Sequence, residues 1–249
     1  MNKKILFGVI FILGLVCVQP ALAIPDAKVP ILMYHYIRNY HSPKDKIGER
    51  LSVSPADFAA QLDLIQRAGY QTAVFADAAT TSPRLPSKTI ILTFDDGYRD
   101  FYTAAFPELK KRRMKAVVYP IYSVIGTSDY LTKEMITEML ASGLVEIGSH
   151  TLNHLDLTHL KPAKLQAEVF QSKLNLERDF GIKILSLCYP YGIYDRAVIA
   201  AAKRAGYLYA LDTKTGQGDW ASPYEMKRYR VDDSTNLAGL LRALGGPSK

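Results

Sequence analysis

Cysteine is scarce in this chain, which has Cys17 and Cys188 among 249 residues. Because Cys17 lies in a segment that we expect to be removed, no intramolecular disulfide is expected, and the fold has to depend on a buried core. Tryptophan occurs once. The longest apolar run has only 14 residues, and this length excludes a multispan membrane protein. Charge of one sign is not in large excess, since 31 Lys and Arg stand against 24 Asp and Glu. We therefore expect no nucleic-acid partner.

The first 23 residues have the three parts of a secretory signal peptide. Residues 1–4 are basic, residues 5–18 form the apolar run, and residues 21–23, Ala-Leu-Ala, fit the small-x-small rule for signal peptidase. A membrane anchor is the alternative, but the run of 14 residues is short of the ~20 that a spanning helix needs. We predict a signal peptide at 1–23, a single exported domain at 24–249 in the periplasm or outside the cell, and no stable membrane anchor.

The rest of the chain has the composition of a globular protein, with 48% hydrophobic and 22% charged residues. Short β-branched runs alternate with amphipathic segments, which predicts an α/β fold with a mainly parallel sheet, an open or closed barrel. Polar stretches at 39–50 and 80–87 are expected to be loops. The strands are predicted at 31–37, 72–75, 89–94, 116–121, 145–149, 184–189, 207–211 and 229–231, and the helices at 55–68, 100–113, 132–142, 162–180, 195–205 and 235–244.

Two adjacent carboxylates follow one of the apolar strands. The strand at 89–94 runs into Asp95, Asp96 and Gly97. Barrels of this class hold their active sites at the carboxyl ends of the strands, so two acids at this place favour a catalytic role. The alternative is an Asp-Gly turn whose acids cap the next helix, and this segment alone leaves both open.

Two histidines follow the strand at 145–149. His150 and His154 are four residues apart, a spacing that puts both side chains on one side of a helical turn, where they can bind one metal ion. Such pairs are more often surface or core residues, but this pair and the acids share the same relative place in the barrel. With Asp96 they would give one oxygen and two nitrogen ligands and leave positions open for water, as in catalytic zinc sites. Asp95 is then free for proton transfer.

These residues resemble the polysaccharide deacetylases of carbohydrate esterase family four, the NodB-homology domain. Residues 93–97, Thr-Phe-Asp-Asp-Gly, are similar to the first family motif, and residues 150–154 are similar to the histidine motif, within a resemblance that covers about 29–231. The resemblance implies a deformed (β/α) barrel and a hydrolase that removes N- or O-acetyl groups from a glycan. It also implies Asp95 as the general base and Asp96, His150 and His154 as ligands of a divalent metal, zinc first, with cobalt or nickel as options.

The third motif departs from the family pattern. Members usually carry an arginine at the position of Cys188, and that arginine orients the base. We expect Arg228 or Arg230 to replace it, because both lie in the last strand region. The Pro-Tyr-Gly part of the motif is present, and by similarity the backbone N–H of Tyr191 would help to hold the oxyanion.

The usual C-terminal histidine of the family, the general acid, is missing as well, since no histidine follows His159. The apolar strand at 31–37 offers His35 instead, which resembles the circularly permuted poly-β-1,6-N-acetylglucosamine deacetylases, where an N-terminal Met-Tyr-His segment supplies the acid. A hydrogen-bonded core histidine is the alternative. We favour His35 as the acid, because the chain otherwise lacks a group of suitable pKa.

The expected substrate is an acetylated polysaccharide such as poly-β-1,6-N-acetylglucosamine, chitin or a wall glycan. Five aromatic residues near the motifs are candidates for stacking on sugar rings, with ordinary packing as the alternative for each: Tyr98, Tyr189, Tyr191, Tyr194 and Trp220. Two other functions remain open, an O-acetyl esterase on a glycan such as xylan and a weakly active carbohydrate-binding relative. We expect a monomer, although no motif specifies the oligomeric state.

Overall fold

The computed structural model describes residues 28–80, 85–86, 88–232 and 234–244. The predicted signal peptide and the start of the predicted mature domain lie outside these residues, as do residues 81–84 and 87 of the expected loop at 80–87. Among the described residues, no helix is both long enough and apolar enough to cross a membrane.

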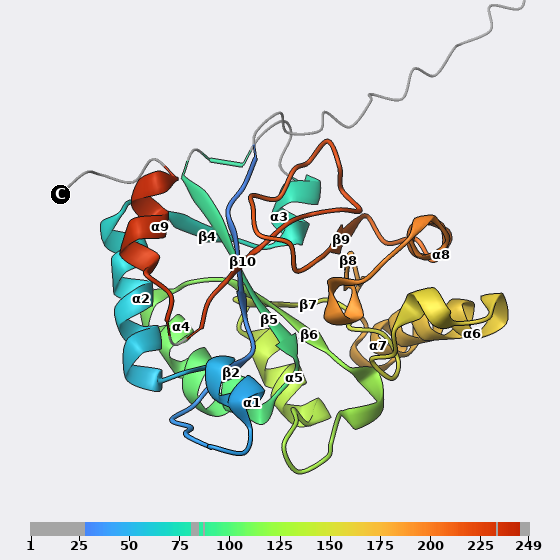
Figure 1. Cartoon of the computed structure of the whole chain (residues 1–249), viewed down its shortest axis with the longest axis horizontal. Coiled ribbons are helices and arrows are strands. Elements are labelled where there is room, and N and C mark those ends of the chain that lie inside the picture. The colour runs from blue at the N-terminus through green and yellow to red at the C-terminus, as the bar shows by residue number, and fades with distance from the viewer. Residues whose placement is uncertain (1–27, 81–84, 87, 233, 245–249) are drawn as a thin grey trace, which may run out of the picture.

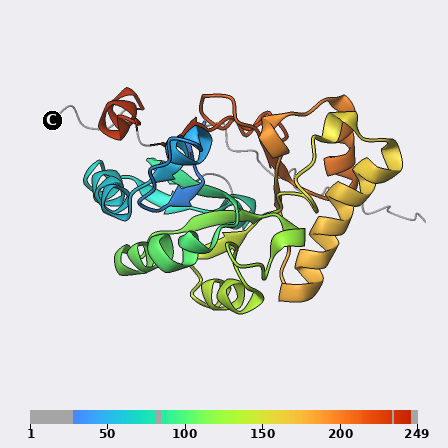
Figure 2. The same cartoon turned by 60° about the horizontal axis from the view of Figure 1, so that its bottom comes forward.

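Parallel strands form the centre of the molecule, and helices surround them (Figures 1 and 2). The strands are β1 Ile31–Tyr34, β2 Tyr36–Ile37, β3 Ser52–Val53, β4 Gln71–Ala73, β5 Thr89–Asp96, β6 Ala116–Pro120, β7 Val145–Ile147, β8 Ser186–Cys188, β9 Tyr209–Leu211 and β10 Tyr229–Arg230. The α-helices are α1 Lys46–Arg50, α2 Pro55–Arg67, α3 Phe75–Thr80, α4 Phe106–Arg112, α5 Lys133–Ala141, α6 Pro162–Gln166, α7 Ser172–Phe180, α8 Arg196–Arg204 and α9 Leu237–Ala243.

The sheet runs in the order β10-β1-β5-β6-β7, and β4 pairs with the start of β5. Beyond β7 the ring continues through β8 and β9, which pair with each other, but only single bridges join this pair to the strands on either side. Ser149 pairs with Leu187 of β8, β8 pairs with β9, and Leu211 of β9 pairs with Met226, just before β10. The strands therefore enclose a barrel with two weak joints, one on each side of the β8-β9 pair.

Alternation along the strands sorts the side chains into two cores. In β5, Ile90, Leu92 and Phe94 pack outward in the large cluster beneath the helices, whereas Ile91 belongs to a smaller cluster inside the barrel. Since successive side chains point to opposite faces, Asp95 has the same orientation as Ile91. The period of β5 therefore directs one carboxylate into the mouth of the barrel.

Most predicted elements are present, and the differences have local causes. The strand at 31–37 is interrupted at His35, and the stretch at 39–50, expected to be a loop, contains α1, whose first turn is capped by Asp45 accepting from the Gly48 N–H at 2.9 Å. The helix at 100–113 begins as a π-helical turn at Phe101–Ala105, because Pro107 has no N–H for a regular helical bond. The helix at 162–180 also contains a π segment, at Ala167–Gln171.

Glu146 of β7 is a charged residue with incomplete pairing in the barrel. Its Oε2 accepts the Ala76 N–H at 2.7 Å, while Oε1 is buried and has no partner among the described residues. Burial raises the pKa of this carboxyl from 4.5 to about 7. The folded state therefore binds the proton more tightly than the unfolded state, so stability is lost as pH rises from the lower to the higher value.

We predict that Glu146→Gln is more stable than the parent above pH ~7, by on the order of 3 kcal/mol, because the uncharged amide keeps an oxygen for Ala76 without a buried charge. Urea unfolding at about pH 5 and about pH 8 would measure this difference, with exposed Glu138→Gln as the matched control. Equal pH dependence in the Glu146 variant and the parent would show the prediction to be wrong.

Candidate active site

The carboxyl ends of four strands bring the candidate residues together. Asp95 and Asp96 end β5, His35 follows β1, His150 follows the bridge residue next to β7, and Cys188 ends β8. Parallel strands place these ends at one mouth of the barrel. All the residues singled out from the motifs, together with Arg228, thus lie around one centre.

Three of them form a group that fits one metal ion. Oδ1 of Asp96 lies 3.3 Å from Nε2 of His150 and 3.6 Å from Nε2 of His154, and the three donor atoms lie within 4.8 Å of one another. Nδ1 of His150 is 2.8 Å from the Cys188 carbonyl oxygen, an acceptor, so Nδ1 carries a proton and Nε2 is the nitrogen that faces the other two donor atoms. One carboxylate and two imidazoles with the remaining positions open are a donor set that suits catalytic zinc.

The charges of Asp96 and His154 also suit a metal. Burial alone would raise the pKa of Asp96, but the hydrogen bond and charge of His150 lower it, so Asp96 is a carboxylate. Burial lowers the pKa of His154 to about 4, helped by the charge of His150. His154 is therefore neutral near pH 7, which is the form that binds a metal. Burial alone would lower the pKa of His150, but Cys188 and the Asp96 and Asp95 carboxylates raise it well above its usual value. Without a metal both ring nitrogens of His150 therefore hold protons, and a metal has to displace the proton on Nε2.

The two histidines converge through a loop and not through a helix. Residues 150–154 have no helical turn, so the helical premise behind the i and i+4 argument was wrong. Thr151 and His154 have φ values of 67° and 56°, and Asp96 has 67°, which is left-handed backbone that costs about 1 kcal/mol or more for a residue with a side chain. The chain bears this strain at the residues where the donor atoms meet.

Glu168 holds this loop, and the sequence analysis missed it. Its buried carboxylate accepts the Asn153 N–H at 2.8 Å and the Asn153 side-chain amide at 2.7 Å, and its backbone oxygen accepts the Leu152 N–H. Lys164 lies 3.2 Å away on the same helical segment. One feature of the sequence could have identified Glu168: it is an acidic residue at a position that would lie on the buried face of an amphipathic helix.

Asp95 is paired with Arg228. The Arg228 guanidinium donates to Oδ1 of Asp95 at 2.7 Å and to Oδ2 at 2.8 Å, and both side chains are almost fully buried. Burial alone would raise the pKa of Asp95, but the charge and hydrogen bonds of Arg228 hold it well below its usual range. Of the two expected candidates, the structure places Arg228 on the carboxylate, whereas half-buried Arg230 makes no hydrogen bond to it among the described residues.

Cys188 leaves room for that guanidinium. Its sulfur lies 3.1 Å from Nη2 of Arg228 and 3.5 Å from Oδ2 of Asp95, so the small side chain sits beside the pair. The Thr93 hydroxyl and the Asp212 carbonyl take the remaining directions of the guanidinium, at 3.1 and 2.8 Å. Arg228, the residue before β10, thus reaches Asp95 by passing beside Cys188, the position at which family members usually carry their arginine.

His35 lies on the other side of Asp95. Its Nε2 is 3.9 Å from Oδ2 of Asp95, and its Nδ1 is buried with no partner in the described part of the chain. Burial lowers the pKa of His35, against the opposing charges of Asp95 and Asp96. A histidine that served only the core would have its polar atoms satisfied, so the free Nδ1 favours a role at the mouth of the barrel.

Tyr191 borders the group on its open side. Its ring is 61% exposed and lies 4.6 Å from the His154 ring, and its φ of 59° turns the backbone at this point. The other four aromatic candidates have no free face for a sugar: Tyr98 is stacked on Tyr36 and Tyr130, Tyr189 is buried and stacked on Tyr194, and Trp220 is buried against Phe75 and Tyr209. For Trp220 and Tyr189 ordinary packing, the alternative given above, is what the structure shows, because the barrel buries both rings.

Known proteins are similar to this chain in both sequence and fold. Residues 82–210 match the family described as polysaccharide deacetylase. YxkH of Bacillus subtilis, whose name describes it as a polysaccharide deacetylase, is 36% identical over 209 residues, which are 82% of this chain and 72% of that protein. A poly-beta-1,6-N-acetyl-D-glucosamine N-deacetylase of Staphylococcus epidermidis is 25% identical over 227 residues, 81% of this chain and 78% of that protein.

Among solved structures, the Streptococcus pyogenes deacetylase PplD in complex with acetate is 31% identical. The match covers 87% of this chain and 98% of PplD with a TM-score of 0.81, which confirms the predicted α/β fold. The resemblance drawn from the motifs at 93–97 and 150–154 is confirmed as well. This chain therefore belongs to the polysaccharide deacetylase family, enzymes that are hydrolases, with the deformed barrel of the NodB-homology domain.

Proposed function

We propose that the chain is a metal-dependent deacetylase that removes N-acetyl groups from a polysaccharide containing N-acetylglucosamine. The observation that carries the proposal is the convergence of Asp96, His150 and His154 beside a carboxylate, Asp95, that an arginine holds ionised. The name of the staphylococcal relative supports an N-acetylglucosamine polymer as substrate. Export through a signal peptide at 1–23 remains part of the proposal.

Asp96, His150 and His154 would hold the metal, zinc first, with cobalt or nickel as options. When bound there, the metal polarises the acetyl carbonyl and makes a water molecule more acidic. Asp95 accepts the proton of the attacking water, because Arg228 keeps it a carboxylate and fixes both of its oxygens. The Tyr191 N–H helps to hold the negative oxygen that forms on the acetyl carbon. His35 gives a proton to the departing sugar nitrogen. Because burial lowers the pKa of His35, it receives that proton from Asp95, whose Oδ2 lies 3.9 Å from its Nε2 and has taken a proton from water.

Replacement of Asp95 by Asn should lower acetate release from N-acetylglucosamine oligomers by at least about 100-fold, because the amide cannot accept the proton of water. Removal of the metal by a chelator should abolish release, and added zinc should restore it. The surface variant Asp63→Asn, on α2, is the control and should behave as the parent. Comparing β-1,6-linked and β-1,4-linked oligomers would identify the preferred polymer.

Two other functions have distinct outcomes in that experiment. Release from acetylated xylan but not from either oligomer would replace the proposal with an O-acetyl esterase. Binding of oligomers without any acetate release, with zinc bound, would replace it with a weakly active carbohydrate-binding relative.

We predict that His35→Ala keeps the metal but loses activity according to the leaving group. Acetate release from an N-acetylglucosamine oligomer should fall about 100-fold or more, because an amine leaves poorly without a proton. Hydrolysis of 4-nitrophenyl acetate should fall far less, because nitrophenolate leaves without one. Metal content and both rates would be measured on the same preparation. Full activity on the oligomer would remove His35 from the mechanism.

Arg228→Met should lower kcat/KM on the oligomer more than tenfold and move the acidic limb of its pH profile to higher pH. The sign follows from the ion pair: without the guanidinium the pKa of Asp95 rises, so the base is protonated at a pH where the parent is still active. Arg230→Met, the rival candidate, should leave that limb nearly in place.

The double variant Cys188→Arg with Arg228→Met tests the arrangement of the pair. It returns a guanidinium to Asp95 from β8, into the space that Arg228 has vacated. We expect it to recover part of the activity and to bring the acidic limb back toward that of the parent. An unchanged pH profile in Arg228→Met would contradict the role given to this arginine.

A further inference from the structure

A row of stacked side chains lies next to the proposed metal site. The ring centroids of Tyr36 and Tyr98 are 3.8 Å apart, and those of Tyr98 and Tyr130 are 5.1 Å apart. The Arg38 guanidinium extends the row, with Cζ 3.5 Å from the Tyr36 ring and 4.0 Å from the Tyr40 ring. We call Tyr36, Tyr98 and Tyr130 the tyrosine row. Because its rings cover one another, it presents edges and hydroxyl groups, and not faces, to its surroundings.

The tyrosine row is attached to the proposed catalytic residues by the chain itself. Tyr36 directly follows His35, Tyr98 is two positions after Asp96, and a backbone bridge joins Tyr98 to Tyr130. Burial raises the pKa of all three hydroxyls, and the negative charge of Asp96 adds to this effect, in agreement with the short chain distance between the tyrosine row and the proposed metal site.

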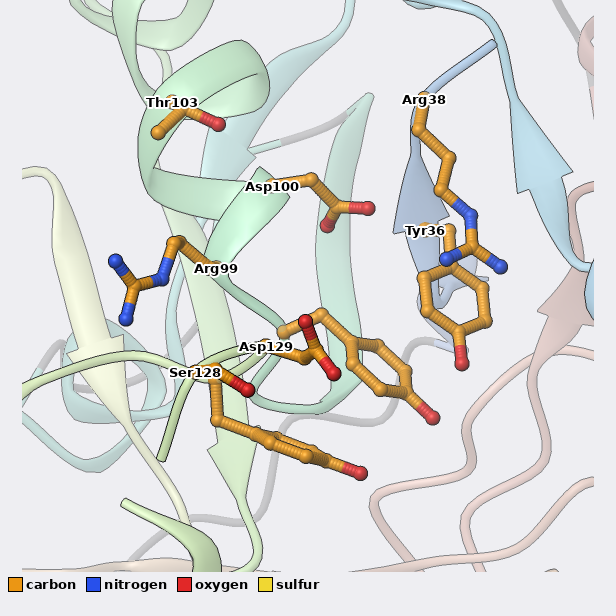
Figure 3. Close-up of a pocket in the computed structure, with 9 residues that line it drawn as sticks. Tyr36, Arg38, Arg99, Asp100, Thr103, Ser128 and Asp129 are labelled. Atoms are coloured by element: carbon orange, nitrogen blue, oxygen red, sulfur yellow. The ribbon is translucent and has the colours of Figure 1, made fainter. Parts of the chain in front are cut away.

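A cleft of about 400 Å³ opens along this row. Its lining includes the tyrosine row, Arg38, Asp100 and Asp129. Figure 3 shows the Asp100 carboxylate and the Tyr36 ring facing the same space, while the Arg99 guanidinium points away from them. Oδ1 of Asp100 is buried and has no hydrogen-bond partner among the described residues. This oxygen is shielded from solvent, so a ligand in the open cleft cannot reach it. The polar groups left to meet a ligand include the tyrosine hydroxyls and the exposed Asp129 side chain.

These features together select the kind of ligand. The volume lies within the range of about 300–1,000 Å³ that is usual for small-molecule sites. The walls combine phenol hydroxyls, which donate and accept, with carboxylates, which accept only, so they suit a ligand that has several hydroxyl groups. A purely apolar ligand would leave the tyrosine hydroxyls and Asp129 without hydrogen bonds.

We propose that this cleft binds the sugar unit next to the one that is deacetylated, through hydrogen bonds between its hydroxyl groups and the tyrosine row and Asp129. The inference rests on the proposed function and adds a residue set that selects polymer over single sugars. Stacking fixes the ring positions before the substrate arrives, so the hydroxyls need not be ordered on binding.

The test uses Tyr→Phe variants, which keep the rings and remove only the hydroxyls. Each of Tyr36→Phe, Tyr98→Phe and Tyr130→Phe should raise KM for an N-acetylglucosamine oligomer by about two- to tenfold, the size of one hydrogen bond, and the triple variant should lose more. Hydrolysis of 4-nitrophenyl acetate, which has no neighbouring sugar, should stay within about twofold of the parent. Tyr102→Phe, whose hydroxyl contacts Glu138 outside the cleft, is the matched control.

Binding measured by calorimetry separates this inference from the proposed function. The parent and the triple variant would each carry Asp95→Asn, so that oligomer binding is measured without turnover. Weaker binding in the triple variant supports the cleft even if the parent releases no acetate, an outcome that would overturn only the proposed function. Equal binding of the oligomer would overturn the cleft, and so would equal losses on oligomer and ester, because those would mean that the tyrosines merely support His35 and the metal site.

Discussion

The buried ion pair between Asp95 and Arg228 connects more of this structure than any other contact described above. Its guanidinium contacts the end of β5 through Asp95 and Thr93, the end of β8 through Cys188, and the residue after β9 through the Asp212 carbonyl. The contact with Asp212 crosses one of the two weak joints of the barrel, the one between β9 and the segment before β10, where a single bridge replaces a full ladder. One side chain thus closes a gap in the sheet and sets the charge of the proposed base.

Such a pair is a costly way to hold a barrel together. Taking two charges out of water offsets much of their attraction, and apolar residues of the same volume are often equally stabilising. Breaking the pair by removing one partner is another matter, because it leaves a buried charge alone at a cost of about 3–5 kcal/mol. The pair is therefore better explained by the work that an ionised carboxylate does at the barrel mouth than by stability.

The sequence was sufficient to predict that the site residues lie at the carboxyl ends of the strands, but not which side chains contact one another there. Strand β5 could be located from its apolar run, and its period of two assigns Asp95 to the interior without any structure. The choice between Arg228 and Arg230 needed the register of β10 against β1, which no local pattern specifies. Glu168, Tyr36 and Tyr130 were missed for the same reason, since each contacts residues from distant segments. Tyr98 was named as a candidate, but for a ring face that its two neighbours cover. His150 and His154 were correctly predicted to lie close together, but they do so in a loop and not in the helical turn that the prediction assumed.

The pair between Asp95 and Arg228 spans 133 residues of chain, and this separation bears on how the molecule folds. Contacts between distant residues form only after a long loop has been closed, so they tend to slow folding and to come late. A chain that has completed β1 to β7 still has the Asp95 carboxylate without its guanidinium, and burial then favours the protonated acid. The guanidinium that holds the proposed base ionised inside the closed barrel arrives with the last strand, so the lowered pKa of Asp95 is a property of the finished fold.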